Sequence, residues 1–330
     1  MRRLDLIPIK GAVLVLAALF GTASASAQSL TLTRAIDLPA VTGRIDHLDI
    51  DLEDGRLFIA ALAAGSLDVV DLASGRRIAR FMPLSQPQGV TYLSARHRVV
   101  IASGGTGRVD AYETAPSAVA SISRLDDADN IRFDARSDRL FVGYGRALAV
   151  LDSRTLAVTQ TIELPGHPEA FELEPSGRRV FVNVPSAGQI VVVDRQSATI
   201  ASTWPVTHAS GNFPMALDAA SDRLHIATRR PSLLQAYETT TGKRVAEVPI
   251  CDDADDLFFD ARRQQLYVVC GQGVVDIVHW HATDRYEVVA QVRTAPGART
   301  GLFVPSLSTL FVAVPARAGE VAQIRVYSIK

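Results

Sequence analysis

The chain has little cysteine, no basic segment beyond its N-terminus and no long apolar run after residue 27. Its two cysteines, Cys251 and Cys270, are too few for a disulfide-stapled scaffold and too far apart for a zinc motif. A formal net charge of −1 without a basic tail gives no support for nucleic-acid binding. The absence of 18 consecutive apolar residues predicts no membrane span in the mature protein.

Several catalytic motifs are also absent from the sequence. It contains no Gly-x-Ser-x-Gly elbow, no phosphate loop, no dinucleotide-binding glycine fingerprint and no His-Glu-x-x-His. The acidic segments 126–130 and 251–256 lack the glycine and glutamate that an EF-hand loop requires. The chemistry must therefore be sought in residues that only the fold brings together.

The N-terminus has the pattern of a secretory signal peptide. Basic residues at Arg2, Arg3 and Lys10 precede or border the short apolar run 11–20, and Ala25-Ser26-Ala27 fits the small-x-small cleavage pattern. We expect a signal peptide over residues 1–27 and a periplasmic or secreted protein, with an uncleaved anchor as the alternative. No cysteine stands at the cleavage position, which disfavours a lipoprotein.

One pattern recurs seven times at intervals of about 40 to 45 residues. An apolar run ending in a carboxylate leads through a turn into a second β run, without helical periodicity. The second runs are 57–60, 99–102, 140–143, 180–183, 224–227, 266–269 and 310–313. This period is typical of four-stranded propeller blades, so the sequence predicts an all-β, seven-bladed propeller with four antiparallel strands per blade.

The two ends of the chain predict how the ring closes. Residues 30–39 match the fourth-strand segment 156–165, whereas the C-terminal segment 324–327 has a third-strand pattern. The N-terminal strand is thus expected to complete the last blade, which removes exposed sheet edges. No linker supports a division of the chain, so we predict one propeller domain over residues 28–330.

The repeat resembles that of the YncE or YVTN-type bacterial propellers along the whole mature chain. The nearest copy of the family's Tyr-Val-Thr-Asn tetrad is Val180-Phe181-Val182-Asn183. The resemblance implies an exported propeller. Such propellers serve as binding modules, as scaffolds and occasionally as enzymes.

Non-repeating residues before the innermost strands identify the candidate site. Alignment of the repeats places one set at equivalent positions around one mouth of the central channel: Asp46, Gln88, Asp129, Glu169, Phe213, Asp255 and Thr300. Neighbouring loop positions add His47, Asn130, His167, Asn212, Arg229 and Arg299. Positions that diverge within a repeated scaffold are where a binding site is expected.

Three hypotheses account for the acidic residues at this mouth. Asp46, Asp129, Glu169 and Asp255 could hold a divalent cation, with calcium or magnesium favoured by oxygen ligands and zinc or copper allowed by histidine. Together with the arginines they could instead bind a small polar or anionic ligand. The simplest alternative is that the acids cap loop amides and stay solvated.

Two further questions stay open at the level of sequence. If Phe259 faces Leu266, Cys270 faces Asp255, and Cys251 lies four residues further along, so a disulfide requires the loop to fold back. For the protein as a whole we favour a monomeric ligand- or metal-binding propeller. A metal-dependent lactonase- or lyase-like enzyme using the same face and a protein-interaction scaffold are the alternatives.

Overall fold

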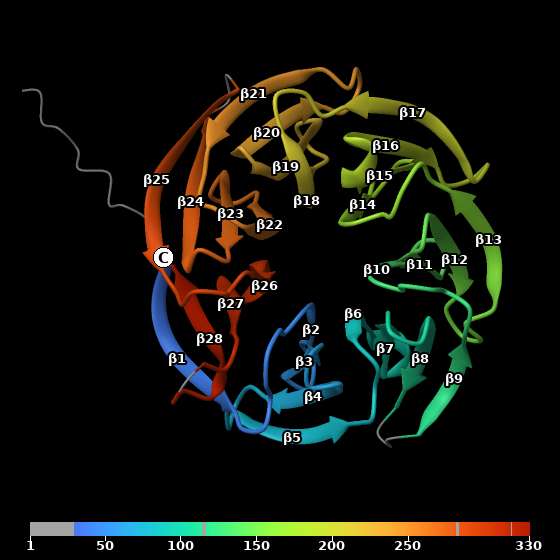
Figure 1. Ribbon diagram of the computed structural model, residues 1–330, viewed down its shortest axis with the longest axis vertical. Coiled ribbons are helices and arrows are strands. Elements are labelled where there is room, and N and C mark those ends of the chain that lie inside the picture. Colours follow the sequence, from blue (N-terminus) through green and yellow to red (C-terminus); the bar gives the residue numbers. More distant parts are fainter. Residues whose placement is uncertain (1–29, 114–116, 282–283, 318) are drawn as a thin grey trace, which may run out of the picture.

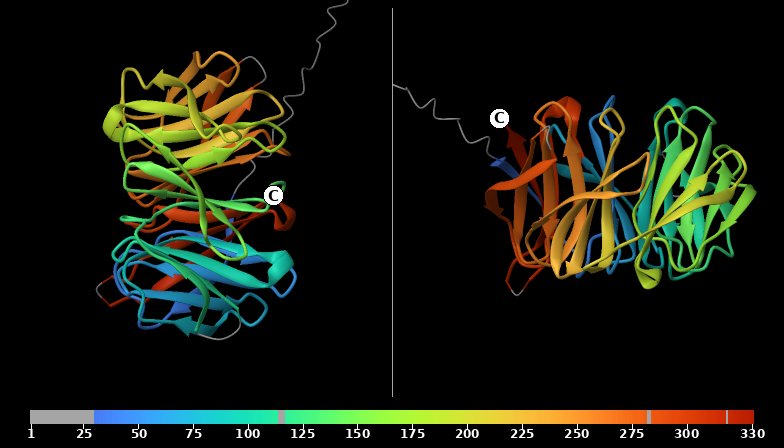
Figure 2. Two further views of the ribbon diagram at one scale, coloured as in Figure 1. Left: turned by 90° about the vertical axis from the view of Figure 1, so that its right-hand side faces the viewer. Right: turned by 90° about the horizontal axis from the view of Figure 1, so that it is seen from above.

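The computed structural model describes residues 30–113, 117–281, 284–317 and 319–330. These residues form seven four-stranded antiparallel sheets arranged as a ring around a central channel (Figures 1 and 2). The all-β, seven-bladed propeller predicted from the repeat is confirmed. The predicted signal peptide, residues 1–27, lies outside the described residues.

Blades are numbered here in chain order, and the strands of each run from the channel outwards. Blade 1 consists of β2 (Leu48–Asp51), β3 (Arg56–Ala61), β4 (Ser66–Asp71) and β5 (Arg76–Phe81). Blade 2 consists of β6 (Pro87–Leu93), β7 (Arg98–Ser103), β8 (Arg108–Tyr112) and β9 (Ala118–Ile122). Blade 3 consists of β10 (Ile131–Asp134), β11 (Arg139–Tyr144), β12 (Ala147–Asp152) and β13 (Val158–Glu163).

The remaining blades repeat this order. Blade 4 consists of β14 (Phe171–Leu173), β15 (Arg179–Val184), β16 (Gln189–Asp194) and β17 (Thr199–Pro205). Blade 5 consists of β18 (Ser210–Asp218), β19 (Arg223–Arg230), β20 (Ser232–Glu238) and β21 (Arg244–Pro249). Blade 6 consists of β22 (Ala254–Asp260), β23 (Gln265–Cys270), β24 (Val274–His281) and β25 (Arg285–Arg293). Blade 7 consists of β26 (Thr300–Val304), β27 (Thr309–Val314), β28 (Ala322–Ile329) and β1 (Leu30–Leu38).

Short 3₁₀ turns are the only helical segments in the described part of the chain: η1 (Ser94–Arg96), η2 (Pro185–Ala187) and η3 (Pro305–Leu307). None of the described helices has the length and apolar character needed to cross a membrane.

The aspartate that ends the third strand of several blades has a local structural role. Asp71 Oδ1 accepts a hydrogen bond of 2.7 Å from the Ser74 amide. Asp152 Oδ1 accepts one of 2.9 Å from the amide of Thr155, three residues further along. These contacts close the hairpin turn between the third and fourth strands by satisfying turn amides. The second strands do not alternate between apolar and polar residues, because both of their faces are buried between blades.

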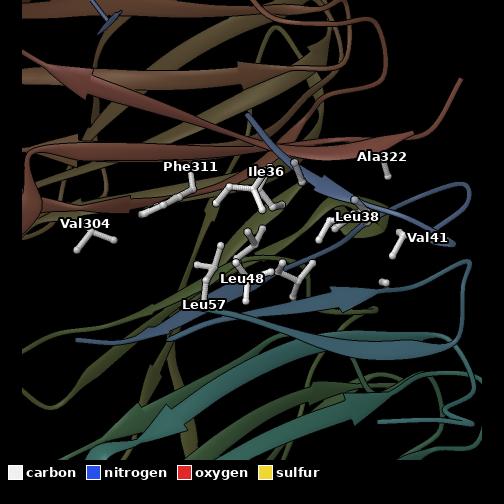
Figure 3. Packing of buried hydrophobic residues seen from close by; sticks show 14 residues of the cluster. Ile36, Leu38, Val41, Leu48, Leu57, Val304, Phe311 and Ala322 are labelled. Carbon is white, nitrogen blue, oxygen red and sulfur yellow. The ribbon is translucent and has the colours of Figure 1, made fainter. Parts of the chain in front are cut away.

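The N-terminal strand closes the ring as predicted. β1 pairs antiparallel with β28, from Leu30 opposite Ile329 to Leu38 opposite Ala322. The buried Ile36 belongs to one apolar cluster with Leu57 of blade 1 and Phe311 of blade 7 (Figure 3). The first strand therefore both completes blade 7 and packs it against blade 1.

Candidate functional site

The loops that precede the innermost strands surround a small polar cavity at one mouth of the channel. Its volume is about 80 Å³. Six carboxylates line it, namely Asp46, Asp129, Glu169, Glu172, Asp255 and Asp256, together with His47, Asn130, Arg44 and Arg132. All four carboxylates expected from the repeat alignment thus border a single cavity.

Equivalent backbone hydrogen bonds place these acids. The amide of Asp46 donates to the carbonyl of Ala60 at 2.8 Å, that of Asp129 to Gly143 at 2.9 Å and that of Glu169 to Asn183 at 2.9 Å. Each acceptor lies on the second strand of the same blade. The same loop geometry, repeated around the ring, therefore directs the three carboxylates to the same mouth.

Asp46, His47 and Asp129 form the tightest group in the cavity. One ligand atom from each side chain lies within 4.8 Å of the other two. Asp46 Oδ1 is 3.3 Å from His47 Nδ1 and 3.3 Å from Arg44 Nη2. Asp46 Oδ2, Asp129 Oδ1 and His47 Nδ1 are buried without a hydrogen-bond partner among the described residues. This group combines two carboxylates and an imidazole, a set that can ligate a metal ion.

The pKa values in this group follow from burial and crowding. Burial is the main cause that raises the pKa of Asp46, despite His47 and Arg44 nearby. Burial opposes the charged form of His47, but Asp46, Asp256 and Asp129 outweigh it and raise the His47 pKa. Compared with free side chains, Asp46 therefore favours its uncharged form and His47 favours its charged form. Both shifts are expected where excess negative charge is buried.

The same excess of negative charge accompanies raised pKa values of two further acids that line the cavity. Burial, followed by the charge of Asp129, raises the pKa of Glu169 to about 7. Burial also raises the pKa of Asp256 to about 7, although its Oδ2 accepts a 2.7 Å hydrogen bond from the Gly301 amide. The cavity therefore carries more buried carboxylates than its own cations compensate.

His167 lies beside the cavity and contacts Asp129 from outside. Its Nε2 is 3.9 Å from Asp129 Oδ2, and its Nδ1 donates to the carbonyl of Gly145 at 3.0 Å. Asp129 is the main cause that raises the pKa of His167 to about 9. His167 is therefore placed to orient and neutralise Asp129 rather than to line the cavity.

Asp255 is held by arginines. Its carboxylate pairs with Arg229, with Arg299 Nε at 3.0 Å and with Arg44 Nη2 at 3.5 Å. Arg229 also lies 3.9 Å from the ring centroid of Phe213. The structure thus brings Arg229 and Arg299 to the mouth, where they neutralise Asp255.

A one-residue irregularity in the strand pairing of blade 6 places Asp255 close to a disulfide. Phe259 pairs with Leu266 as expected, but a shift between Ala254 and Asp256 places Ala254, not Asp255, opposite Cys270. Such a β-bulge bends the strand and re-aims a side chain. Cys251 and Cys270 form a disulfide with a Cα–Cα distance of 6.0 Å, which answers the question that the sequence left open.

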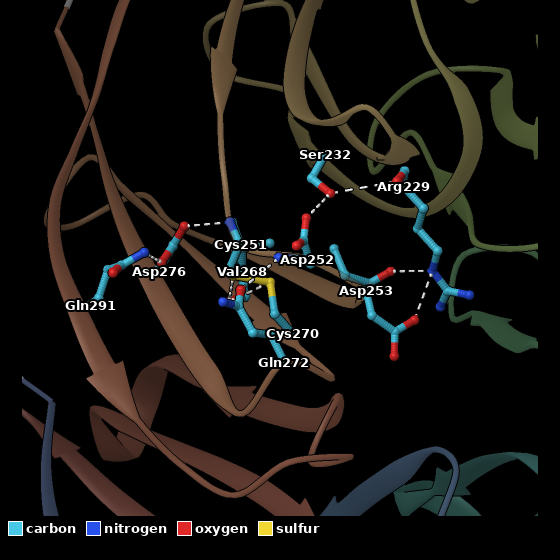
Figure 4. The surroundings of a disulfide bond; sticks show 11 residues. Arg229, Ser232, Cys251, Asp252, Asp253, Val268, Cys270, Gln272, Asp276 and Gln291 are labelled. Carbon is cyan, nitrogen blue, oxygen red and sulfur yellow. Dashed lines mark hydrogen bonds and ion pairs between the residues drawn. A yellow bond between two sulfur atoms is a disulfide. The ribbon is translucent and has the colours of Figure 1, made fainter.

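The disulfide lies beside a network that reaches Arg229 (Figure 4). The Cys251 amide donates to Asp276 Oδ2 at 2.8 Å, and the Asp252 amide donates to Gln272 Oε1 at 3.0 Å. The next residue, Asp253, contacts Arg229 Nε at 3.3 Å and Arg299 Nη1 at 3.1 Å. The loop that supplies the partners of both arginines is therefore anchored at its start.

Of three further residues expected at the site, Gln88 and Asn212 lie outside the cavity lining, whereas Asn130 lines it. Gln88 donates to the Ala128 carbonyl at 3.5 Å, outside the lining. The buried Asn212 donates to Asn183 Oδ1 at 3.0 Å and joins blade 5 to blade 4. Asn130 does line the cavity, where its Oδ1 accepts from Arg132 Nη1 at 3.4 Å.

The alignment of the last repeat requires a correction of one residue. Val312 pairs with Gly301 rather than with Leu302. Arg299, not Thr300, therefore occupies the position equivalent to Asp46. Glycine permits this pairing, since a Cβ at residue 301 would lie 2.5 Å from the Phe311 carbonyl oxygen.

Arg44 and Arg132 were not recognised from the sequence as site residues. Arg44 stands only two residues before Asp46, so its position in the same loop as a predicted site residue could have identified it. Arg132 belongs to β10, where its guanidinium lies 5.6 Å from the ring centroid of Phe171. No pattern in the sequence distinguishes it from other strand arginines.

Comparison with known proteins establishes a distant relationship and the fold. Searched against protein-family models, the chain matches none. Protein NirF of Pseudomonas aeruginosa is 27% identical over 135 residues, which cover 39% of this chain and 33% of NirF. The match thus spans about a third of NirF, and the chain is a distant homologue of that protein.

Solved structures with the same fold have little sequence in common with this chain. A chain of the crystal structure of the mitotic checkpoint complex aligns with a TM-score of 0.78 at 13% identity, covering 99% of this chain and 98% of its own. A chain of Kuenenia stuttgartiensis hydrazine synthase aligns with a TM-score of 0.74 at 15% identity, covering 88% and 96%. These similarities show the propeller fold alone.

Proposed function

We propose that this protein is an exported metal-binding propeller whose site is formed by Asp46, His47 and Asp129. The observation that carries the proposal is the approach of three ligand atoms to within 4.8 Å of one another at the channel mouth. Asp46 and His47 precede the innermost strand of blade 1 and Asp129 precedes that of blade 3, so the fold itself assembles the group.

The unpaired polar atoms support a cation over a structural role. A buried carboxylate oxygen without a partner costs roughly 1–3 kcal/mol. Asp46 and Asp129 each have one such oxygen in the same cavity. A bound divalent cation would compensate both, whereas the loop-cap alternative leaves them unexplained.

The size of the cavity favours a metal ion over an organic ligand in the innermost part of the site. Small-molecule pockets typically measure about 300–1,000 Å³. A volume of about 80 Å³ corresponds to only a few water molecules at about 30 Å³ each. It suits an ion with its remaining waters.

The ligand types favour zinc or a similar transition ion over calcium or magnesium. Calcium and magnesium select oxygen ligands, while imidazole suits zinc, copper and iron. Since His47 is part of the tightest group, we propose zinc as the resident ion. Three protein ligands leave a position for water or for a small anionic ligand.

The disulfide supports the proposed location. Stable disulfides form in oxidising compartments such as the periplasm and are rare in the cytosol. The Cys251–Cys270 bond therefore supports the periplasmic or secreted location that the N-terminal pattern predicts.

Zinc titration of the metal-stripped full chain tests the proposal. We expect one saturable site, lost in Asp129→Asn and in His47→Gln, with a rise in melting temperature that depends on zinc concentration. Asp255→Asn is the matched comparison, because Asp255 borders the same cavity but pairs with arginines. Zinc binding in the Asp129→Asn variant equal to that of the unmodified chain would refute the three-ligand site. Loss in Asp255→Asn equal to that in Asp129→Asn would point instead to the wider acidic ring.

A further inference from the structure

The second strand of most blades begins with arginine. The five residues at this position are Arg56, Arg98, Arg139, Arg179 and Arg223, in blades 1 to 5. They lie at the turn between the first and second strands, on the opposite face of the ring from the proposed metal site. Because the five arginines occupy equivalent positions of the repeat, the partners of each can be compared with those of the others.

Four of these arginines bind a carboxylate of the protein. The pairs are Arg56 with Asp51 at 2.6 Å, Arg98 with Glu113 at 2.9 Å, Arg179 with Glu174 at 2.5 Å and Arg223 with Asp284 at 2.7 Å. The position thus functions repeatedly as a carboxylate-binding position.

Arg139 is the exception among the described residues. Its Nη1 donates to the hydroxyl of Thr159 at 2.5 Å, and it has no ion pair within the described part of the chain. Asp134, which corresponds to Asp51 of blade 1, is engaged elsewhere. Its Oδ2 is 3.3 Å from Arg195 Nη1 and accepts from Ser137 Oγ at 2.7 Å. Arg139 therefore retains a guanidinium fork without its usual partner.

The Arg139 guanidinium lines a cavity of about 400 Å³ between blades 3 and 4. The buried Phe141 and Val150 contribute apolar lining, and Gln160 supplies a polar side chain. Arg136 lines the same cavity, and its Nη1 donates to the Pro175 carbonyl at 3.2 Å, without an ion pair among the described residues. The other two arginines there, Arg178 and Arg195, already pair with Asp194 and Asp134.

We infer that this cavity binds a short dicarboxylate, with one carboxylate on Arg139 and the second on Arg136. Arginine can bind planar carboxylates through two parallel hydrogen bonds. Arg223 binds Asp284 in this way, with Nε 2.7 Å from Oδ1 and Nη2 2.9 Å from Oδ2. The volume lies within the range of small-molecule sites. The inference does not depend on the proposed metal site.

Calorimetric titration of the full chain with succinate tests the inference. We expect saturable binding by the unmodified protein, weakened about ten- to a hundredfold in Arg139→Gln, because a charge-assisted pair contributes about 1.5–3 kcal/mol. Arg139→Lys should recover part of the affinity, since it keeps the charge but loses the fork. Butyrate, which has one carboxylate, should bind more weakly than succinate.

Arg98→Gln is the matched control, because it removes an equivalent arginine whose partner is internal. It should leave succinate binding unchanged. Equal melting temperatures of Arg139→Gln and the unmodified chain without ligand would show that the variant is folded. The inference is wrong if succinate shows no saturable binding, if Arg139→Gln binds it normally, or if Arg98→Gln weakens it equally.

Discussion

A buried histidine in blade 5 should make its own contribution to the stability of this propeller fall at mildly acidic pH. His225 occupies a position of β19 that holds phenylalanine in four other second strands, namely Phe58, Phe141, Phe181 and Phe311. It is fully buried, stacks on Phe259 at 5.7 Å between ring centroids, and its Nε2 lies 3.0 Å from the Tyr286 hydroxyl. Burial lowers its pKa to about 3, and the nearby Arg223 adds to this while Asp284 opposes it.

The sign of the effect follows from proton binding. The unfolded chain takes up a proton at this histidine near pH 6.5, whereas the folded chain does so only near pH 3. His225 therefore destabilises the folded state as pH falls below about 6.5, by about 1.4 kcal/mol per pH unit. Between pH 7 and pH 5 the loss from this residue is about 2 kcal/mol.

His225→Phe removes this loss while keeping an aromatic side chain. Urea unfolding of both proteins at pH 7 and pH 5 should show the variant gaining about 2 kcal/mol relative to the unmodified chain at the lower pH. Any constant cost of losing the Tyr286 contact cancels in that comparison. Tyr286→Phe removes the hydrogen bond but keeps the histidine, so it should retain the pH dependence. Parallel pH profiles for His225→Phe and the unmodified chain would refute the reasoning.

Two further predictions concern the ring closure and the disulfide. Ile36→Ala in β1, at a side chain 2% exposed, should lower the free energy of unfolding by about 2–4 kcal/mol in urea titrations. Leu32→Ala in the same strand, at 49% exposure, should change it by less than about 0.5 kcal/mol, and equal effects would contradict the packing of β1 described above. Replacing both Cys251 and Cys270 by alanine opens a link across 19 residues and should cost about 3 kcal/mol. A reductant should lower the urea midpoint of the unmodified chain only, and a midpoint insensitive to reductant would show that the bond contributes nothing to stability.

The fold could be predicted largely from the sequence because each structural unit is repeated. The apolar second runs, such as 57–60 and 310–313, lie in strands buried on both faces, and burial keeps their pattern visible. The match between residues 30–39 and an internal fourth strand predicted the β1–β28 pairing correctly. These inferences needed only periodicity.

The partners within the site could not be predicted in the same way. Alignment placed Asp46, Asp129, Glu169 and Asp255 around one mouth, and all four line one cavity. It did not show that Asp255 is neutralised by arginines, because that pairing joins blade 5, blade 7 and the loop before blade 1.

The periodic pattern also did not predict shifts of one residue in the pairing of the strands. The bulge beside Asp255 moves Cys270 opposite Ala254, and the pairing of Gly301 moves Arg299 into the ring of equivalent positions. Both shifts depend on local backbone fit, which an alignment of apolar runs does not contain.

The most direct test of the metal site is a crystal structure of the zinc-soaked protein with anomalous scattering recorded at the zinc edge. The proposal predicts one strong peak at about 2.0–2.2 Å from ligand atoms of Asp46, His47 and Asp129. A peak elsewhere on the ring, or no peak at the channel mouth at saturating zinc, would contradict it.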